Sequence, residues 1–73
     1  MIKVLINTKE IRKRRIDKEL SQIQLAEMIQ VNNSYLCEIE NGHVIPSLAL
    51  MANIACALGC TIDELLIKET ENE

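Results

Sequence analysis

The chain has 73 residues and a net charge of −3, and its apolar residues are almost all aliphatic, since it has one Tyr and no Trp or Phe. We expect one domain with a modest core, because only roughly 60% of the unfolded surface is buried on folding at this length. No apolar run approaches the ~20 residues of a membrane span and the first residues lack a signal-peptide pattern, so we expect a cytoplasmic protein with no membrane partner.

The charges are distributed unevenly along the chain. Residues 1–18 carry seven basic and two acidic side chains, a local charge of +5, whereas residues 19–73 carry one basic and nine acidic side chains, a charge of −8. A basic first segment can attract DNA while the acidic groups lie on the far side. The alternative is that the basic run is simply a solvated helix face.

The first elements in chain order are a short strand and a helix. Ile2, Val4 and Ile6 alternate with other side chains, which predicts an N-terminal strand that could pair with residues 66–70. Thr8 can then cap a first helix that ends near residue 18.

Residues 20–42, LSQIQLAEMIQVNNSYLCEIENG, predict two short helices joined by a tight turn. Apolar residues recur at helical intervals, and the polar segment VNNS interrupts them. Ser21 and Gln24 can form a capping box at the first helix, and Asn32 can cap the second, which ends near Gly42. Such a pair can present its second helix to a DNA groove.

Two more helices are expected in the last third of the chain. After a loop, Ser47 can cap a fourth helix that Gly59 closes. The sequence TIDELL then predicts a fifth helix, in which Thr61 and Glu64 form another capping box. Beyond Ile67 the charged tail KETENE is expected to fray.

The order and spacing of these motifs resemble a known family. From Ile11 to Leu66 the chain has LSQ, LA, ENG, PS and ALG at the separations of the phage-repressor Cro/CI-like helix-turn-helix family, also called Xre. The resemblance implies an all-α fold, a compact five-helix lambda-repressor-like bundle, to which the short N-terminal strand would be added. It also implies a single domain over 1–73, with a core at about 8–67 and a tail at 68–73, that binds double-stranded DNA.

The resemblance further implies which side chains contact DNA. These residues are Gln22, Asn32, Asn33, Ser34, Tyr35, Glu38, Asn41 and His43. Side chains near the start of the second motif helix meet base edges, where Asn33 can bond adenine and Glu38 can accept from cytosine. Gln22 and Asn41 correspond to residues that bind backbone phosphates in the family.

Several of these positions have an alternative interpretation. Glu38 and His43 can be solvated surface groups, and Asn41 can serve only to end its helix. Tyr35 can pack as a half-buried ring instead of bonding a phosphate.

Arg15 and Glu40 stand where the family has an arginine and a glutamate that bridge the first helix and the second helix of the motif, which is called the recognition helix. A guanidinium can pair with both oxygens of a carboxylate and hold the two helices in one register. If Glu40 neutralises Arg15, the attraction for DNA is expected to depend on Arg12, Lys13 and Arg14.

The chain departs from the family pattern at several positions. Glu19 and Gln30 occupy sites that are usually glycine, and a non-glycine residue is strained there if the backbone is left-handed. Arg14 replaces an aliphatic residue, so Ile16 is expected to take over its packing. The recognition helix contains no Arg or Lys, the residues that most often contact guanine.

The three cysteines do not predict a metal centre or a disulfide framework. Cys56 and Cys60 are four apart, but a zinc site needs four ligands, and the chain has one histidine and no CxxC pair. The odd number of cysteines argues against paired disulfides. Cys60 is expected to fill a core position, and Cys37 replaces a small residue. No cofactor is expected, and no constellation of catalytic residues is present, so an enzyme is not expected.

The sequence favours a sequence-specific transcriptional regulator, a repressor that acts as a homodimer on a palindromic operator with half-sites about 34 Å apart. Ile62, Leu66 and Ile67 are the expected dimer interface. Alternatives are an antitoxin or a restriction-modification controller with the same DNA-binding unit, or an acidic protein-interaction module that does not bind DNA.

Overall fold

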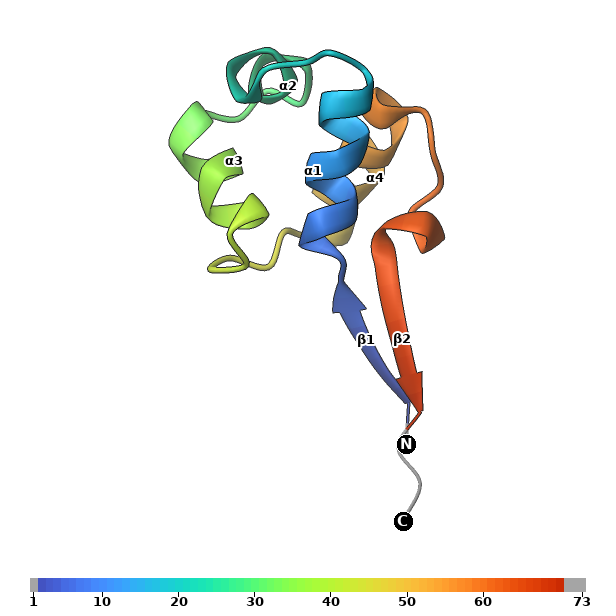
Figure 1. Cartoon of the computed structure of the whole chain (residues 1–73). Coiled ribbons are helices and arrows are strands. Elements are labelled where there is room, and N and C mark those ends of the chain that lie inside the picture. The colour runs from blue at the N-terminus through green and yellow to red at the C-terminus, as the bar shows by residue number, and fades with distance from the viewer. Residues whose placement is uncertain (1, 71–73) are drawn as a thin grey trace.

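The computed structural model describes the backbone of residues 2–70 and the side chains of residues 5–67. The elements in order are β1 (Ile2–Ile6), α1 (Thr8–Asp17), α2 (Gln22–Met28), α3 (Asn33–Glu40), α4 (Leu48–Leu58), a 3₁₀ turn η1 (Asp63–Leu65) and β2 (Leu66–Thr70). The helices form one body, and β1 and β2 form a ribbon that extends away from it (Figure 1). In the described residues, no helix is long and apolar enough to cross a membrane.

Side-chain caps fix where the helices of the motif begin. Ser21 Oγ accepts from the backbone N of Gln24 at 3.1 Å, and Gln24 Oε1 accepts from the backbone N of Ser21 at 2.8 Å. The capping box is therefore confirmed. Asn32 Oδ1 accepts from the backbone N of Tyr35 at 2.7 Å, and Ser47 caps α4 in the same way. These caps depend on residues within one turn, which is why the sequence predicts them.

The cap of α1 is Asn7, and the prediction of Thr8 was wrong by one residue. The backbone N of Asn7 donates to the carbonyl of Leu65 at 2.8 Å, which holds residue 7 outside the helix at φ −86° and ψ 86°. From there Asn7 Oδ1 accepts from the backbone N of Glu10 at 3.1 Å. A contact from the far end of the chain therefore sets this boundary.

Left-handed residues end the first two helices. Glu19 and Gln30 have φ of 59° and 60°, so these two sites require the conformation that glycine adopts most easily. The chain turns tightly at both places, because the backbone N of Leu20 donates to the carbonyl of Arg15 and the backbone N of Val31 donates to the carbonyl of Ala26. Gly59 closes α4 at φ 71°, as predicted.

The core is aliphatic and draws on every helix. Its buried members are Ile11, Leu25, Ala26, Ile29, Leu36, Met51, Ile54, Ala55, Leu58 and Leu65. Cys60 packs against this cluster, as expected. Ile16 does not take over a packing role, since 57% of its surface is exposed. Arg14 remains partly buried at its own position and bonds Glu10 and Glu64 there, at 2.7 and 3.0 Å.

The predicted fifth helix is wrong, and residues 2–70 contain four α-helices. Thr61 and Glu64 do bond reciprocally, with Glu64 Oε1 accepting from the Thr61 backbone N at 3.0 Å and Thr61 Oγ1 accepting from the Glu64 backbone N at 3.3 Å. Only a 3₁₀ turn follows. The next residues pair antiparallel with β1 from Ile6↔Leu66 to Ile2↔Thr70. The segment between α4 and β2 is therefore too short for a stable helix.

The pairing of the N-terminal strand with residues 66–70 is confirmed. The expected tail is wrong over 68–70, because β2 extends to Thr70. Residues 71–73 of that tail lie outside the described residues.

Candidate nucleic-acid interface

Helix α3 packs one face against the body of the protein and exposes the other. Leu36 and Ile39 are fully buried, whereas Asn33, Ser34 and Glu38 are exposed. The spacing of the two apolar residues turns them to one side, and the three polar residues lie away from the core. The motif therefore presents a polar edge on a rigidly packed helix.

At the N-terminus of α3, one side chain caps the helix and the next two are exposed. Asn32 is exposed, but its Oδ1 is bonded to the backbone of Tyr35, so this oxygen serves as the cap. Tyr35 is half-buried, in agreement with a ring that packs on one side. Asn33 and Ser34 are the exposed side chains of the first turn.

Glu38 and His43 lie together at the other end of this edge. His43 Nδ1 is 3.3 Å from Glu38 Oε2, and the backbone N of His43 donates to the carbonyl of Glu38 at 2.9 Å. Both side chains are exposed. The sequence did not predict this contact, in which a shared turn brings the imidazole next to the carboxylate.

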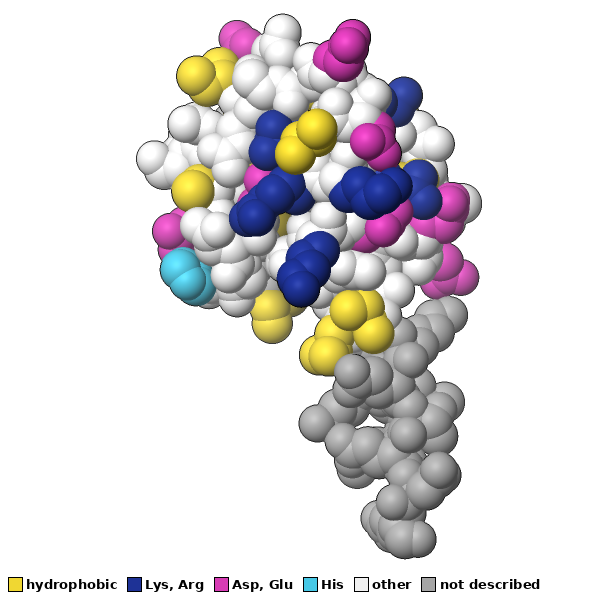
Figure 2. All heavy atoms as spheres, viewed as in Figure 1, with side chains coloured by type: hydrophobic (Ala, Val, Ile, Leu, Met, Phe, Trp, Pro, Cys, Tyr) yellow, Lys and Arg dark blue, Asp and Glu magenta, His cyan; other side chains and the backbone are white. Residues whose placement is uncertain are grey.

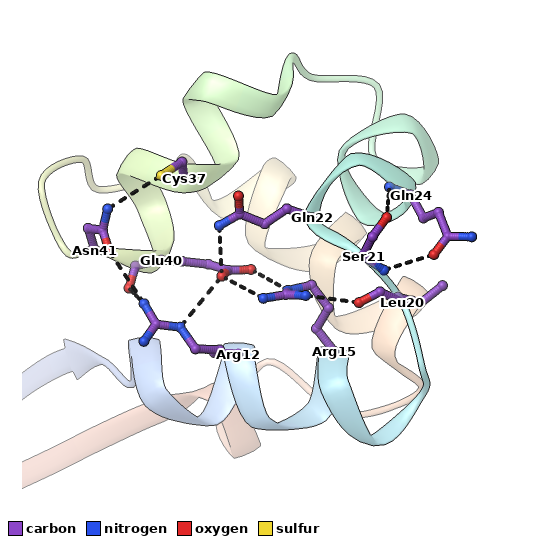
Figure 3. A network of polar contacts seen from close by, with 9 residues as sticks. All are labelled: Arg12, Arg15, Leu20, Ser21, Gln22, Gln24, Cys37, Glu40 and Asn41. Atoms are coloured by element: carbon purple, nitrogen blue, oxygen red, sulfur yellow. Dashed lines mark hydrogen bonds and ion pairs between the residues drawn. The ribbon is translucent and has the colours of Figure 1, made fainter.

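A buried carboxylate lies behind the polar edge. The side chain of Glu40 has no exposed surface, and three donors surround it (Figure 3). Arg15 Nε donates to Oε2 at 2.8 Å and Arg15 Nη2 donates to Oε1 at 3.2 Å. Gln22 Nε2 donates to Oε1 at 3.1 Å. The expected Arg15–Glu40 pair is present in the structure, and it has the bidentate geometry that gives directional strength.

Gln22 therefore connects α2 to α3 directly. Its oxygen points away from Glu40 (Figure 3). The Gln22 Nε2 donates one N–H to Glu40 and has a second N–H, because a carboxamide nitrogen carries two hydrogens.

Arg12, which was expected only to attract DNA, also contacts Glu40 and Asn41. Its Nε lies 3.7 Å from Glu40 Oε1, and its Nη2 donates to Asn41 Oδ1 at 3.3 Å and to the carbonyl of Glu40 at 3.4 Å. Asn41 Nδ2 donates in turn to Cys37 Sγ at 3.4 Å. Arg12 and Asn41 are 29 positions apart, so no local pattern could have indicated this contact.

The three basic side chains that were expected to attract DNA all have acidic partners. The pairs are Arg12 with Glu40, Lys13 with Asp17, and Arg14 with Glu10 and Glu64. Figure 2 shows basic side chains gathered over α1, with acidic side chains beside them. The hydrogen bond to Glu10 raises the pKa of Arg14 above its ordinary value. The positive charge of α1 is therefore largely neutralised within the protein.

Two of the three residues expected at a dimer interface also pack against the protein's own core. Ile62 and Leu66 are half-buried and pack against the core, while Ile67 has 38% of its surface exposed. The prediction assumed a fifth helix with apolar residues to spare. The 3₁₀ turn and the strand place two of these three side chains against the protein itself.

The cysteines are free thiols in different surroundings. Cys56 is exposed, whereas Cys37 and Cys60 are half-buried. Burial raises the pKa of the Cys60 thiol.

Comparisons with known proteins agree with this geometry. A family model described as helix-turn-helix matches residues 11–65. The immunity repressor protein of Bacillus phage phi105 is 41% identical over 64 residues, which cover 81% of this chain and 44% of the repressor. The chain thus spans less than half the length of that relative.

Two solved structures have the same fold and sequences related to this one. The restriction-modification controller protein C.AhdI from Aeromonas hydrophila has a TM-score of 0.76 and 33% identity, over 80% of this chain and 88% of the controller. SinR, a master regulator for biofilm formation solved in complex with DNA, has a TM-score of 0.75 and 30% identity, over 82% of this chain and 97% of the SinR chain in that structure. The chain belongs to the Cro/CI-like helix-turn-helix family.

Proposed function

We propose that this protein is a sequence-specific DNA-binding transcriptional regulator, a repressor that binds a palindromic operator as a homodimer, with residues 1–73 as a single domain. The observation that carries the proposal is the exposed edge of Asn33, Ser34 and Glu38 on a helix whose opposite face is buried. A helix placed this way can enter the major groove while the rest of the motif stays outside it. A DNA-bound regulator would act in the cytoplasm.

The chemistry of this edge suggests which base pairs it reads. Asn33 can donate to adenine N7 and accept from adenine N6, and Glu38 can accept from cytosine N4. Ser34 can bond several bases or a phosphate. Because α3 has no Arg or Lys, we expect its direct contacts to favour adenine and cytosine over guanine.

Phosphate contacts would come mostly from neutral donors. The neutral amides of Gln22 and Asn41 flank the edge of α3, and His43 adds a cationic donor only when it is protonated, whereas the charges of α1 are paired with acidic side chains. Binding that releases few counterions depends weakly on salt. We therefore expect a shallower salt dependence than is typical of a strongly basic DNA-binding protein.

The dimer is proposed on physical grounds. One copy offers a short reading edge, and two copies on half-sites about 34 Å apart would supply the missing affinity and specificity. Of the three residues expected to mediate the contact, Ile67 is the one with substantial exposed surface.

A restriction-modification controller is the second candidate, because C.AhdI, a protein of that kind, matches 80% of this chain. It would use the same DNA-binding edge, so the two candidates differ in the genes that they control.

Selection from a random duplex library at two salt concentrations tests the proposal. We expect enrichment of a palindromic site, and sedimentation of the selected duplex with two protein copies. Failure to bind any duplex at the lower salt concentration would contradict the proposal and favour a protein-interaction module. Recovery of a single half-site with one bound copy would contradict the dimer alone.

A further inference from the structure

The amide of Asn41 is held at both of its ends. Arg12 Nη2 donates to Asn41 Oδ1 at 3.3 Å, and Asn41 Nδ2 donates to Cys37 Sγ at 3.4 Å (Figure 3). The two ends of a carboxamide are chemical opposites, because the oxygen only accepts hydrogen bonds and the nitrogen only donates them. Which end faces outward decides whether this exposed residue attracts or repels an anion.

Arg12 determines that choice. A guanidinium has five N–H donors and no acceptor, so the atom of Asn41 that faces it has to be the oxygen. Arg12 is itself held by Glu40: its Nε lies 3.7 Å from the buried carboxylate, and the Nη2 that donates to Asn41 also donates to the backbone carbonyl of Glu40. Its side chain is 48% exposed, so this anchor lies at the surface and next to the end of α3.

We propose that Arg12 is a positioning residue for DNA binding. By holding Oδ1, it directs the Nδ2 of Asn41, with the N–H that Cys37 does not use, toward a backbone phosphate. It also prevents the amide from rotating by half a turn and presenting its oxygen to that phosphate. The inference rests on the proposed DNA-binding function and adds a residue and a mechanism to it.

A direct contact between Arg12 and phosphate makes a different prediction. Each phosphate neutralised by a cationic side chain makes the negative slope of log K against log salt concentration steeper by about 0.9. A positioning residue leaves that slope almost unchanged, because its charge stays paired with Glu40. The effect of its loss would also vanish when Asn41 is absent.

The experiment is a double-mutant cycle on the duplex selected from the random library. We expect Arg12→Met and Asn41→Ala each to weaken binding about fivefold, in line with one lost hydrogen bond. The double variant should be no weaker than either single variant. Arg12→Lys should bind like Arg12→Met, since an ammonium cannot span Glu40 and Asn41 as a planar fork does.

Lys13→Met is the matched control, because Lys13 lies on the same helix and pairs with Asp17 instead. It removes the same charge, and its effect should multiply with that of Asn41→Ala. If Arg12→Met and Asn41→Ala also multiply, and Arg12→Met lowers the salt slope, Arg12 contacts phosphate directly and the inference is wrong.

A readout without DNA separates this inference from the proposed function. In the free protein, the side-chain ¹⁵N resonance of Asn41 should report an ordered amide that becomes mobile in Arg12→Met, while thermal unfolding confirms that both proteins are folded. An amide with equal mobility in both proteins contradicts the inference alone. A wild-type protein with an ordered amide that binds no duplex contradicts the proposed function, and the role of Arg12 in binding with it.

Discussion

Arg15 on α1 donates hydrogen bonds to both carboxylate oxygens of Glu40 on α3, at 2.8 and 3.2 Å, although the two residues are 25 positions apart in the sequence. The same guanidinium donates through Nη1 to the carbonyl of Leu20 at 2.9 Å, just before α2. One side chain therefore fixes α1, the approach to α2 and the end of the recognition helix relative to each other. This contact gives the polar edge of α3 a defined orientation.

The first prediction concerns this buried pair. Glu40→Ala removes a fully buried carboxylate and leaves Arg15, whose side chain is 13% exposed, without its charge partner. We expect a loss of about 3–5 kcal/mol in the free energy of unfolding, the usual effect of removing one partner of a buried ion pair. Urea unfolding measures it.

Asp17→Ala is the control for this variant, because it breaks the exposed Lys13–Asp17 pair on α1. Exposed pairs contribute less than about 1 kcal/mol. Equal losses for the two variants would show that the Arg15–Glu40 pair does not order the motif.

The second prediction concerns the left-handed residues Glu19 and Gln30, at φ of 59° and 60°. Glycine at either site relieves the strain of a side chain in this conformation. The larger entropy of glycine in the unfolded chain offsets part of this gain in stability. We expect Glu19→Gly and Gln30→Gly each to raise stability by about 1 kcal/mol. Thermal unfolding checks this, and Glu27→Gly inside α2 should instead lower stability by about 1 kcal/mol. A loss of stability at both left-handed sites would refute the argument.

The third prediction is a pH dependence at η1. Hydrogen bonds from Thr61, the backbone N–H first and then the hydroxyl, lower the pKa of Glu64 below its ordinary value of 4.5, with a further contribution from Arg14. A carboxyl whose pKa falls on folding stabilises the protein above its ordinary pKa, and that contribution is lost as pH falls through the lowered value.

Glu64→Ala should therefore be less stable than wild type at neutral pH, and the difference should shrink below about pH 4.5. Melting temperatures across this range measure it, with Glu27→Ala as an exposed control. A difference that stays constant down to the lowest pH would exclude a contribution from the Glu64 charge.

Much of the fold could be predicted from the sequence because much of it is local. The caps at Ser21, Asn32 and Ser47 each bond a residue three positions away. The fifth helix could not be judged locally: the TIDELL segment has a genuine capping box, but pairing with β1 draws the following residues into a strand. The cap of α1 moved to Asn7 for a similar reason, since its backbone bonds Leu65.

The candidate site also has a part that the local sequence predicts and a part that depends on how the helices pack. The exposure of Asn33 and Ser34 follows from the helical spacing of the buried residues on α3. The contact between Arg12 and Asn41 depends on how α1 and α3 meet, and no periodicity encodes that. The pairing of the α1 charges with acidic side chains is likewise a property of the folded surface, and a count of charges along the chain cannot show it.

The most direct measurement of the central claim compares Asn33→Ala with Asn53→Ala on the duplex selected from the random library. Asn33 lies on the exposed edge of α3, and Asn53 is another exposed asparagine, on α4 and outside the motif. We predict that Asn33→Ala weakens binding by about 1–3 kcal/mol and relaxes the preference for one base pair in each half-site, while Asn53→Ala binds like wild type. Unchanged affinity and base preference in Asn33→Ala would contradict the claim that this edge reads DNA.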